Sequence, residues 1–126
     1  MALDCLLSSI AQNYADTCPT GHSDSATRTA QYGTKEYIGE NIAAATGMDV
    51  SAQGWAAEEA NWDCKTSSCM RGVCGHFTQM IWGQTTRIGC GIKKGCGLSH
   101  PLGDNILVCH YAQGGNYVGV SPLLKP

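Results

Sequence analysis

The chain has 126 residues, a formal net charge of −2 and 14% charged residues. This length suits one domain, residues 1–126, and no long run of Lys or Arg supplies the basic surface that binding to nucleic acid requires. No apolar stretch approaches the roughly 20 residues that cross a bilayer, so the sequence predicts no transmembrane helix.

The eight cysteines are the strongest compositional signal. An even, high count in a short chain predicts a disulfide framework formed in an oxidising, extracellular compartment. The N-terminus has neither a basic start nor a long apolar segment, so it is no signal peptide, and we expect a mature portion or a fragment. The alternative is a zinc site of Cys64, Cys69, Cys74 and His76, although its spacings are looser than those of the usual C-x2-C sites.

Apolar residues recur at three- and four-residue steps from Leu3 to Cys18, which predicts an amphipathic helix ended by Pro19. A polar loop is expected over residues 20–34, followed at 37–45 by a turn that enters a short helix.

A second clear helix is expected from about Ser51 to Trp62. Glu58 and Glu59 both lie between Trp55 and Trp62 in helical projection. Periodicity therefore leaves open which of the two carboxylates faces the tryptophan side.

Two strands are expected near the C-terminus, at 87–93 and 105–111. The turn-rich connection between them predicts an antiparallel hairpin, across which Cys90 and Cys109 are able to pair. His110 then faces the side opposite to Cys109. Helices followed by paired strands indicate an α+β domain.

The segment 75–82 places His76 and Gln79 inside an aromatic and aliphatic run. Polar groups enclosed by apolar neighbours must find partners or lose stability. These two side chains therefore either satisfy a buried network or line a cavity.

Three motifs together resemble the CAP superfamily, which comprises cysteine-rich secretory proteins, antigen 5 and plant pathogenesis-related proteins of class 1. They are Gly-His-Phe-Thr-Gln-Met-Ile-Trp-Gly-Gln-Thr at 75–85, Ile-Leu-Val-Cys-His-Tyr-Ala-Gln-Gly-Gly-Asn-Tyr at 106–117, and Gly-Glu-Asn-Ile at 39–42. The resemblance implies a disulfide-rich α/β/α three-layer sandwich with a central antiparallel sheet, in a secreted protein. It also implies a disulfide set, namely Cys69–Cys74, Cys90–Cys109 and Cys18–Cys96, which leaves Cys5–Cys64 as the fourth pair.

Family members carry a cleft with two histidines and two acidic residues that often holds zinc or another divalent ion. By resemblance, His76 is the second histidine, Glu40 is one acid, and a Trp-x-x-Glu pattern selects Glu58 as the other. Gln79 is expected to support the cleft. We expect the first histidine to be absent with the N-terminal helix that carries it, because no His-Asn-x-x-Arg motif is present.

This departure leaves His76 as the single histidine expected to bind a metal ion, and no cofactor is required. The remaining histidines, His22, His100 and His110, are expected to be structural or solvated.

The resemblance favours a secreted binding protein with a role in defence, venom or allergenicity, rather than an enzyme. Its partners would be a sterol, a fatty acid or another protein. One alternative is a hydrolase, with or without a metal, that uses His76 with Glu58 or Glu40. Another is a truncated structural relative that keeps only the scaffold, with its exposed apolar surface covered by a partner or, in a homodimer, by a second copy of the chain.

Overall fold

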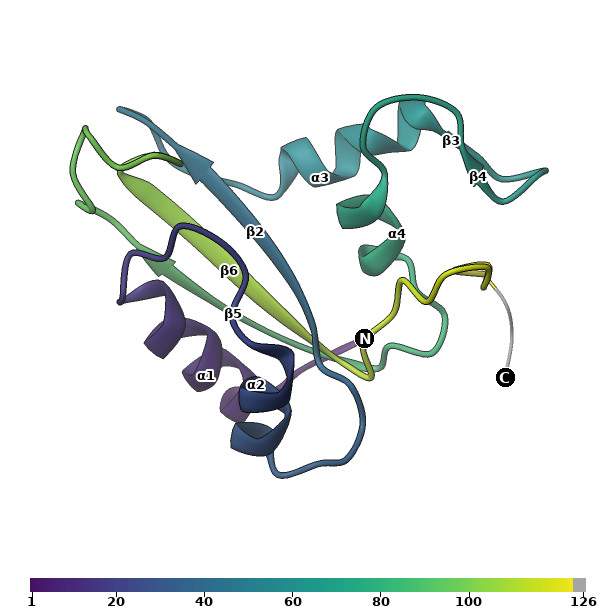
Figure 1. Ribbon diagram of the computed structural model, residues 1–126, viewed down its shortest axis with the longest axis horizontal. Helices are drawn as coiled ribbons and strands as arrows, with labels where there is room; N and C mark the ends of the chain where they lie inside the picture. The colour runs from purple at the N-terminus through teal and green to yellow at the C-terminus, as the bar shows by residue number, and fades with distance from the viewer. Residues whose placement is uncertain (124–126) are drawn as a thin grey trace.

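A four-stranded sheet forms the middle of the molecule in the computed structural model, which describes residues 1–123 (Figure 1). Its strands lie in the order β1 (Ala2–Leu3), β5 (Arg87–Lys93), β6 (Asn105–Ala112) and β2 (Gly39–Ala45). The three long strands pair antiparallel, whereas the two-residue β1 joins β5 in parallel. The sheet is therefore mixed rather than wholly antiparallel, and the expected hairpin of β5 and β6 is confirmed.

Helices cover both faces of this sheet (Figure 1). On one face lie α1 (Cys5–Ala15) and α2 (Ser25–Tyr32), and on the other lie α3 (Gln53–Ala57), the 3-10 helix η1 (Glu58–Asn61) and α4 (Gly75–Met80). Ala11 and Ala15 of α1 pack against Ile106 and Val108 of β6. Trp55 of α3 packs against the alternate residues of the same strand, Leu107, Cys109 and Tyr111. The three-layer α+β fold is thus confirmed.

The helix α1 lies unusually close to β5 because two strand residues are glycines. A Cβ atom on Gly89 would lie 2.1 Å from the backbone nitrogen of Ser8, and one on Gly91 would lie 2.4 Å from the Cα atom of Gln12. The close approach lets the Gln12 side chain donate to the carbonyl oxygen of Ile92 at 2.8 Å and accept from its amide at 3.0 Å.

Two expected elements were wrong. The polar loop contains α2, which is capped by Asp24 at its start and by Gly33, in the left-handed conformation (φ 78°), at its end. The segment expected to be a short helix is β2, which pairs with β6 along its whole length. An alanine-rich run has a strong helix propensity, and here the strand pairing overrides it.

The helix expected over 51–62 is present but shorter. It begins at Gln53, tightens into η1 after Ala57, and ends where Trp62 enters the strand β3 (Trp62–Asp63). β3 forms a two-stranded hairpin with β4 (Ser68–Cys69). Within residues 1–123, no helix is both long and apolar enough to cross a membrane.

Three of the four expected disulfides are present: Cys18–Cys96, Cys69–Cys74 and Cys90–Cys109. The fourth was wrong, because Cys5 and Cys64 are free and exposed. Cys5 opens α1 on one side of the sheet, whereas Cys64 lies in the turn between β3 and β4 beyond the other side (Figure 1). The Cys69–Cys74 bond also excludes the alternative zinc site, because two of its four ligands are joined to each other.

Candidate functional site

The structure contains two histidine–carboxylate pairs, one on each face of the sheet. Glu40 and His110 lie directly opposite each other on β2 and β6, so both point to the face that α1 and α2 cover. The next residue of β2, Asn41, points to the other face, where its amide donates to the backbone oxygen of His76 at 3.1 Å. Glu58 and His76 belong to this second face.

Glu58 and His76 meet at the start of α4. The Nδ1 atom of His76 lies 2.7 Å from Oε2 of Glu58. The other carboxylate oxygen accepts the backbone amides of His76 and Phe77, at 3.0 and 3.1 Å. The imidazole stacks on Trp55, with ring centroids 5.9 Å apart and an angle of 12° between the planes. The orientation of the ring is therefore fixed, and Nδ1 is the donor to the carboxylate because a carboxylate oxygen accepts.

An imidazole oriented by a carboxylate is the arrangement of a general base. A covalent mechanism also needs a nucleophile within hydrogen-bonding reach. The hydroxyl of Thr78 instead donates to Gly75 and Asn116, and those of Ser67 and Ser68 contact other hydroxyls. Of the hydroxyl residues near His76 in sequence, none is hydrogen-bonded to its ring in the part of the chain that the structure describes.

Glu40 is the centre of the other network. Its carboxylate accepts His22 Nδ1 at 2.8 Å, His110 Nε2 at 2.7 Å, and the amide and hydroxyl of Ser23 at 2.9 and 2.6 Å. The guanidinium of Arg28 lies 3.9 Å away. Burial raises the pKa of Glu40, but the hydrogen bonds from His110, His22 and Ser23 outweigh burial and hold this pKa well below its usual range. Glu40 is therefore an ionised, buried carboxylate that fastens the segment before α2 to the sheet.

The structure thus brings Glu58 and His76 together and places Glu40 on the opposite face of the sheet. Gln79 is buried but belongs to neither pair. Its side chain accepts the amide of Gly115 at 2.9 Å and donates to the hydroxyl of Thr85 at 3.3 Å, which braces the loop after β6.

His22 and His110 were not singled out from the sequence as site residues. His110 could have been found from its position opposite Glu40, had residues 39–45 been recognised as a strand paired with β6. His22 lies in an irregular segment and carries no periodic signal. His100, expected to be solvated, instead has Nε2 2.8 Å from the backbone oxygen of Cys18.

The metal-binding capacity of these pairs is small. Among residues 1–123, no group of three or more His, Cys, Asp or Glu side chains is arranged to hold a metal ion. Nε2 of His76 offers one nitrogen ligand, whereas zinc sites in proteins use three or four. The geometry therefore provides at most an incomplete site, and zinc binding at His76 stays a prediction.

An apolar groove of about 390 Å³ opens on the same face of the sheet as His76. Its walls come from α3, the end of α4 and the strands β5 and β6. Trp55 forms one side, and the Cys90–Cys109 disulfide lies in the floor. The lining residues are Met1, Ala52, Trp55, Met80, Ile88, Cys90, Leu107, Cys109 and Tyr111. The hydroxyl of Tyr111 already accepts the Asn41 amide at 3.0 Å, and burial raises the pKa of Tyr111 to about 12.

Comparison with known proteins gives one consistent result. A family model described as CAP, the cysteine-rich secretory protein family, matches residues 1–111. GLIPR1-like protein 1 of Bos taurus is 31% identical over 127 residues, covering 97% of this chain and 52% of the relative. Pathogenesis-related protein 1 of Arabidopsis thaliana is 40% identical over 87 residues, covering 67% of this chain and 50% of the relative. The chain therefore spans about half the length of these two relatives.

A solved structure shows the same arrangement of elements. Venom allergen-like protein 4 of Schistosoma mansoni superposes with a TM-score of 0.69 at 27% sequence identity, covering 90% of this chain and 68% of that chain.

Proposed function

Because the chain belongs to the CAP family of cysteine-rich secretory proteins, we propose that it is an extracellular binding protein that holds a fatty acid or sterol in the apolar groove. The groove carries this proposal. Its volume lies within the range of about 300–1,000 Å³ found for small-molecule sites. Each Å² of apolar ligand surface that leaves water there contributes about 25 cal/mol to binding. The proposed binding needs no metal ion.

The hydrolase alternative rests on the pairing of His76 with Glu58. Since no hydroxyl nucleophile is hydrogen-bonded to the ring within residues 1–123, this alternative requires a water molecule activated by Nε2. Turnover of a peptide or ester panel that disappears in His76→Ala, with the variant still folded, would support it. Inactivity of the native chain with and without added zinc would remove it.

A fluorescent sterol tests the binding proposal directly. Trp55 lines the groove, so its emission should transfer to bound dehydroergosterol. Ala52→Phe places a ring in the groove and should lower the affinity about tenfold or more, which corresponds to about 1.4 kcal/mol. Ala56→Phe adds the same ring to the exposed side of α3 and is the matched control.

Folded protein that takes up neither dehydroergosterol nor a fluorescent fatty acid would refute the lipid proposal. Equal affinities of the two variants would place the ligand outside the groove. Sedimentation velocity tests whether a second copy of the chain covers the groove instead, and a dimer that Ala52→Phe dissociates would identify that occupant.

A further inference from the structure

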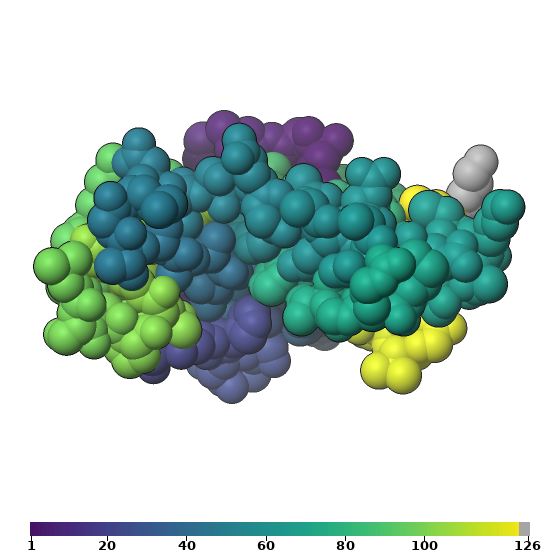
Figure 2. Space-filling view, turned by 90° about the horizontal axis from the view of Figure 1, so that it is seen from above, coloured from purple at the N-terminus to yellow at the C-terminus, as the bar shows by residue number. Residues whose placement is uncertain are grey.

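A second, larger cavity lies at the far end of the molecule from the β5–β6 turn. Its volume is about 540 Å³, and it lies between the β3–β4 hairpin and the segment 116–122. Figure 2 shows these two parts of the chain, in teal and yellow, at the same end of the molecule. The lining residues are Trp62, Thr66, Ser67, Ser68, Cys69, Cys74, Gly75, Thr78, Trp82, Asn116, Tyr117, Gly119, Val120, Ser121 and Pro122. We call this cavity the hairpin pocket. It shares no lining residue with the apolar groove.

The walls of the hairpin pocket are fixed by contacts between distant segments. The hydroxyls of Ser67 and Ser121 lie 3.0 Å apart and join the hairpin turn to the C-terminal segment. The backbone oxygen of Pro122 accepts the amide of Gly83 at 2.8 Å. A ligand would therefore meet a site whose two sides are already held together.

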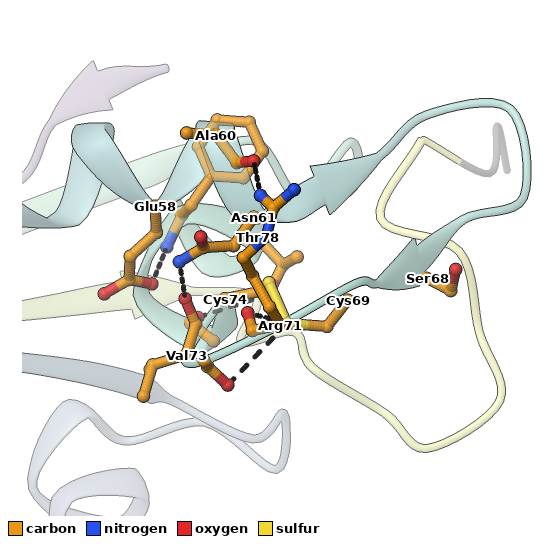
Figure 3. Close-up of a disulfide and its surroundings, with 12 residues drawn as sticks. Glu58, Ala60, Asn61, Ser68, Cys69, Arg71, Val73, Cys74 and Thr78 are labelled. Carbon is orange, nitrogen blue, oxygen red and sulfur yellow. Dashed lines mark hydrogen bonds between the residues drawn. A yellow bond between two sulfur atoms is a disulfide. The ribbon is translucent and has the colours of Figure 1, made fainter.

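The disulfide Cys69–Cys74 forms part of the lining and ties the hairpin to the start of α4 (Figure 3). Next to this disulfide, the side chain of Arg71 donates to the backbone oxygen of Ala60 at 2.7 Å. The side-chain amide of Asn61 donates to the backbone oxygen of Val73 at 3.1 Å. These bonds hold the 69–74 loop in place, so the base of the pocket is rigid.

The chemistry of the lining combines aromatic rings with hydroxyl groups. Trp82 and Tyr117 lie with ring centroids 6.2 Å apart at an angle of 57°, and Trp62 supplies a third ring. Around them lie the hydroxyls of Thr66, Ser67, Ser68 and Ser121 and the amide of Asn116. Among the described residues, Ser67 bonds only Ser121, which also accepts the amide of Leu123, whereas the hydroxyl of Thr66 bonds both Asp63 and Ser68. The Asn116 side chain bonds Thr78 and Gly75. Because a hydroxyl offers one donor and two acceptor positions, each of these hydroxyls keeps at least one position for a ligand.

The lining carries no charged side chain: none of the described residues around the pocket is Asp, Glu, Lys, Arg or His. A charged ligand would lose its hydration there without gaining an ion pair. The indole N–H of Trp62 is buried and has no acceptor among residues 1–123. Because the lining is uncharged and combines aromatic rings with hydroxyl groups, the pocket favours a neutral ligand that presents apolar faces to the rings and hydroxyls to the rim.

We propose that the hairpin pocket binds a neutral saccharide. The C–H face of a sugar ring packs against the exposed ring of Tyr117, which the buried Trp82 supports from behind, while the sugar hydroxyls bond to the serine and threonine hydroxyls and to Asn116. This site is independent of the lipid groove, so either proposal can fail without the other.

The three tryptophans make the test specific, because Trp62 and Trp82 line the hairpin pocket and Trp55 lines the groove. The indole N–H signals are followed by ¹⁵N-¹H NMR during titration with chitotriose, cellotriose and mannotriose at millimolar concentration. At least one of these neutral probes should move the Trp62 and Trp82 signals and leave the Trp55 signal in place. A heparin-derived disaccharide should move none of them.

Tyr117→Ala removes an aromatic wall and should weaken binding about tenfold. Val118→Ala is the matched control, because Val118 is fully exposed and does not line the pocket. An unchanged Trp55 signal reports that each variant is folded. The proposal is overturned if no neutral probe moves the Trp62 and Trp82 signals, if the sulfated sugar binds as well as the neutral ones, or if the two variants bind equally.

Discussion

Replacing Glu40 by glutamine should destabilise the protein, although the two side chains have the same shape. The carboxylate accepts four hydrogen bonds, from His22, from His110 and two from Ser23. In Glu40→Gln, one acceptor oxygen becomes an NH₂ group that faces donors. At least one donor from a histidine and one from Ser23 then lose their acceptor inside the protein.

The expected loss follows from those bonds. A hydrogen bond to a charged group contributes about 1.5–3 kcal/mol, so two lost bonds lower the free energy of unfolding by about 3–6 kcal/mol at pH 7. Urea denaturation followed by circular dichroism measures this difference. Glu59→Gln, at an exposed position, is the matched control and should change the free energy of unfolding by less than about 0.5 kcal/mol.

The pH dependence supplies a second check. Because the pKa of Glu40 is depressed in the folded state, its ionisation contributes stability that is complete above the unfolded value of 4.5 and is lost as the pH falls below it. The native protein should therefore lose stability more steeply below pH 4.5 than Glu40→Gln does. Equal free energies of unfolding at pH 7, together with parallel acid limbs, would refute the reasoning.

Two further predictions concern packing and thiols. Gly89→Ala should cost about 3 kcal/mol or more in urea denaturation, because the new Cβ would lie 2.1 Å from the backbone nitrogen of Ser8. Gly54→Ala, whose Cβ meets nothing within 4 Å inside α3, should instead stabilise the protein by about 0.5–1 kcal/mol, and equal effects would contradict the close-approach argument. Thiol titration of the unfolded, unreduced chain should find two thiols, Cys5 and Cys64, and a count of zero would show that these two are bonded.

Elements with their own periodic signal could be predicted from the sequence. The helix α1 and the strands β5 and β6 follow from local patterns of apolar residues. β2 could not be predicted in this way, because Ala43, Ala44 and Ala45 favour a helix and become a strand only through pairing with β6. α2 was missed because its polar surface hides the period, although Asp24 and Gly33 are recognisable as caps.

In the candidate site, too, local motifs could be read from the sequence, whereas features that depend on strand pairing could not. The pairing of Glu58 with His76 agrees with the family motif, and the structure resolves the choice that periodicity left open between Glu58 and Glu59. The separation of Glu40 from His76 depends on strand alternation in β2, so it could not be seen while that segment was expected to be helical. Cys5–Cys64 failed for a related reason, since counting leftover cysteines contains no information about distance.

The three disulfides overlap along the chain in a way that affects proteolysis. The loop closed by Cys18–Cys96 contains both cysteines of the Cys69–Cys74 bond. The loop closed by Cys90–Cys109 starts at Cys90, before the Cys18–Cys96 loop ends. Every peptide bond from residue 18 to residue 109 is therefore spanned by at least one disulfide. A protease that cuts once anywhere in this range leaves a single covalent molecule, which separates into two fragments only after reduction. In a medium rich in proteases, a nicked chain would keep both histidine–carboxylate pairs tethered to the same sheet.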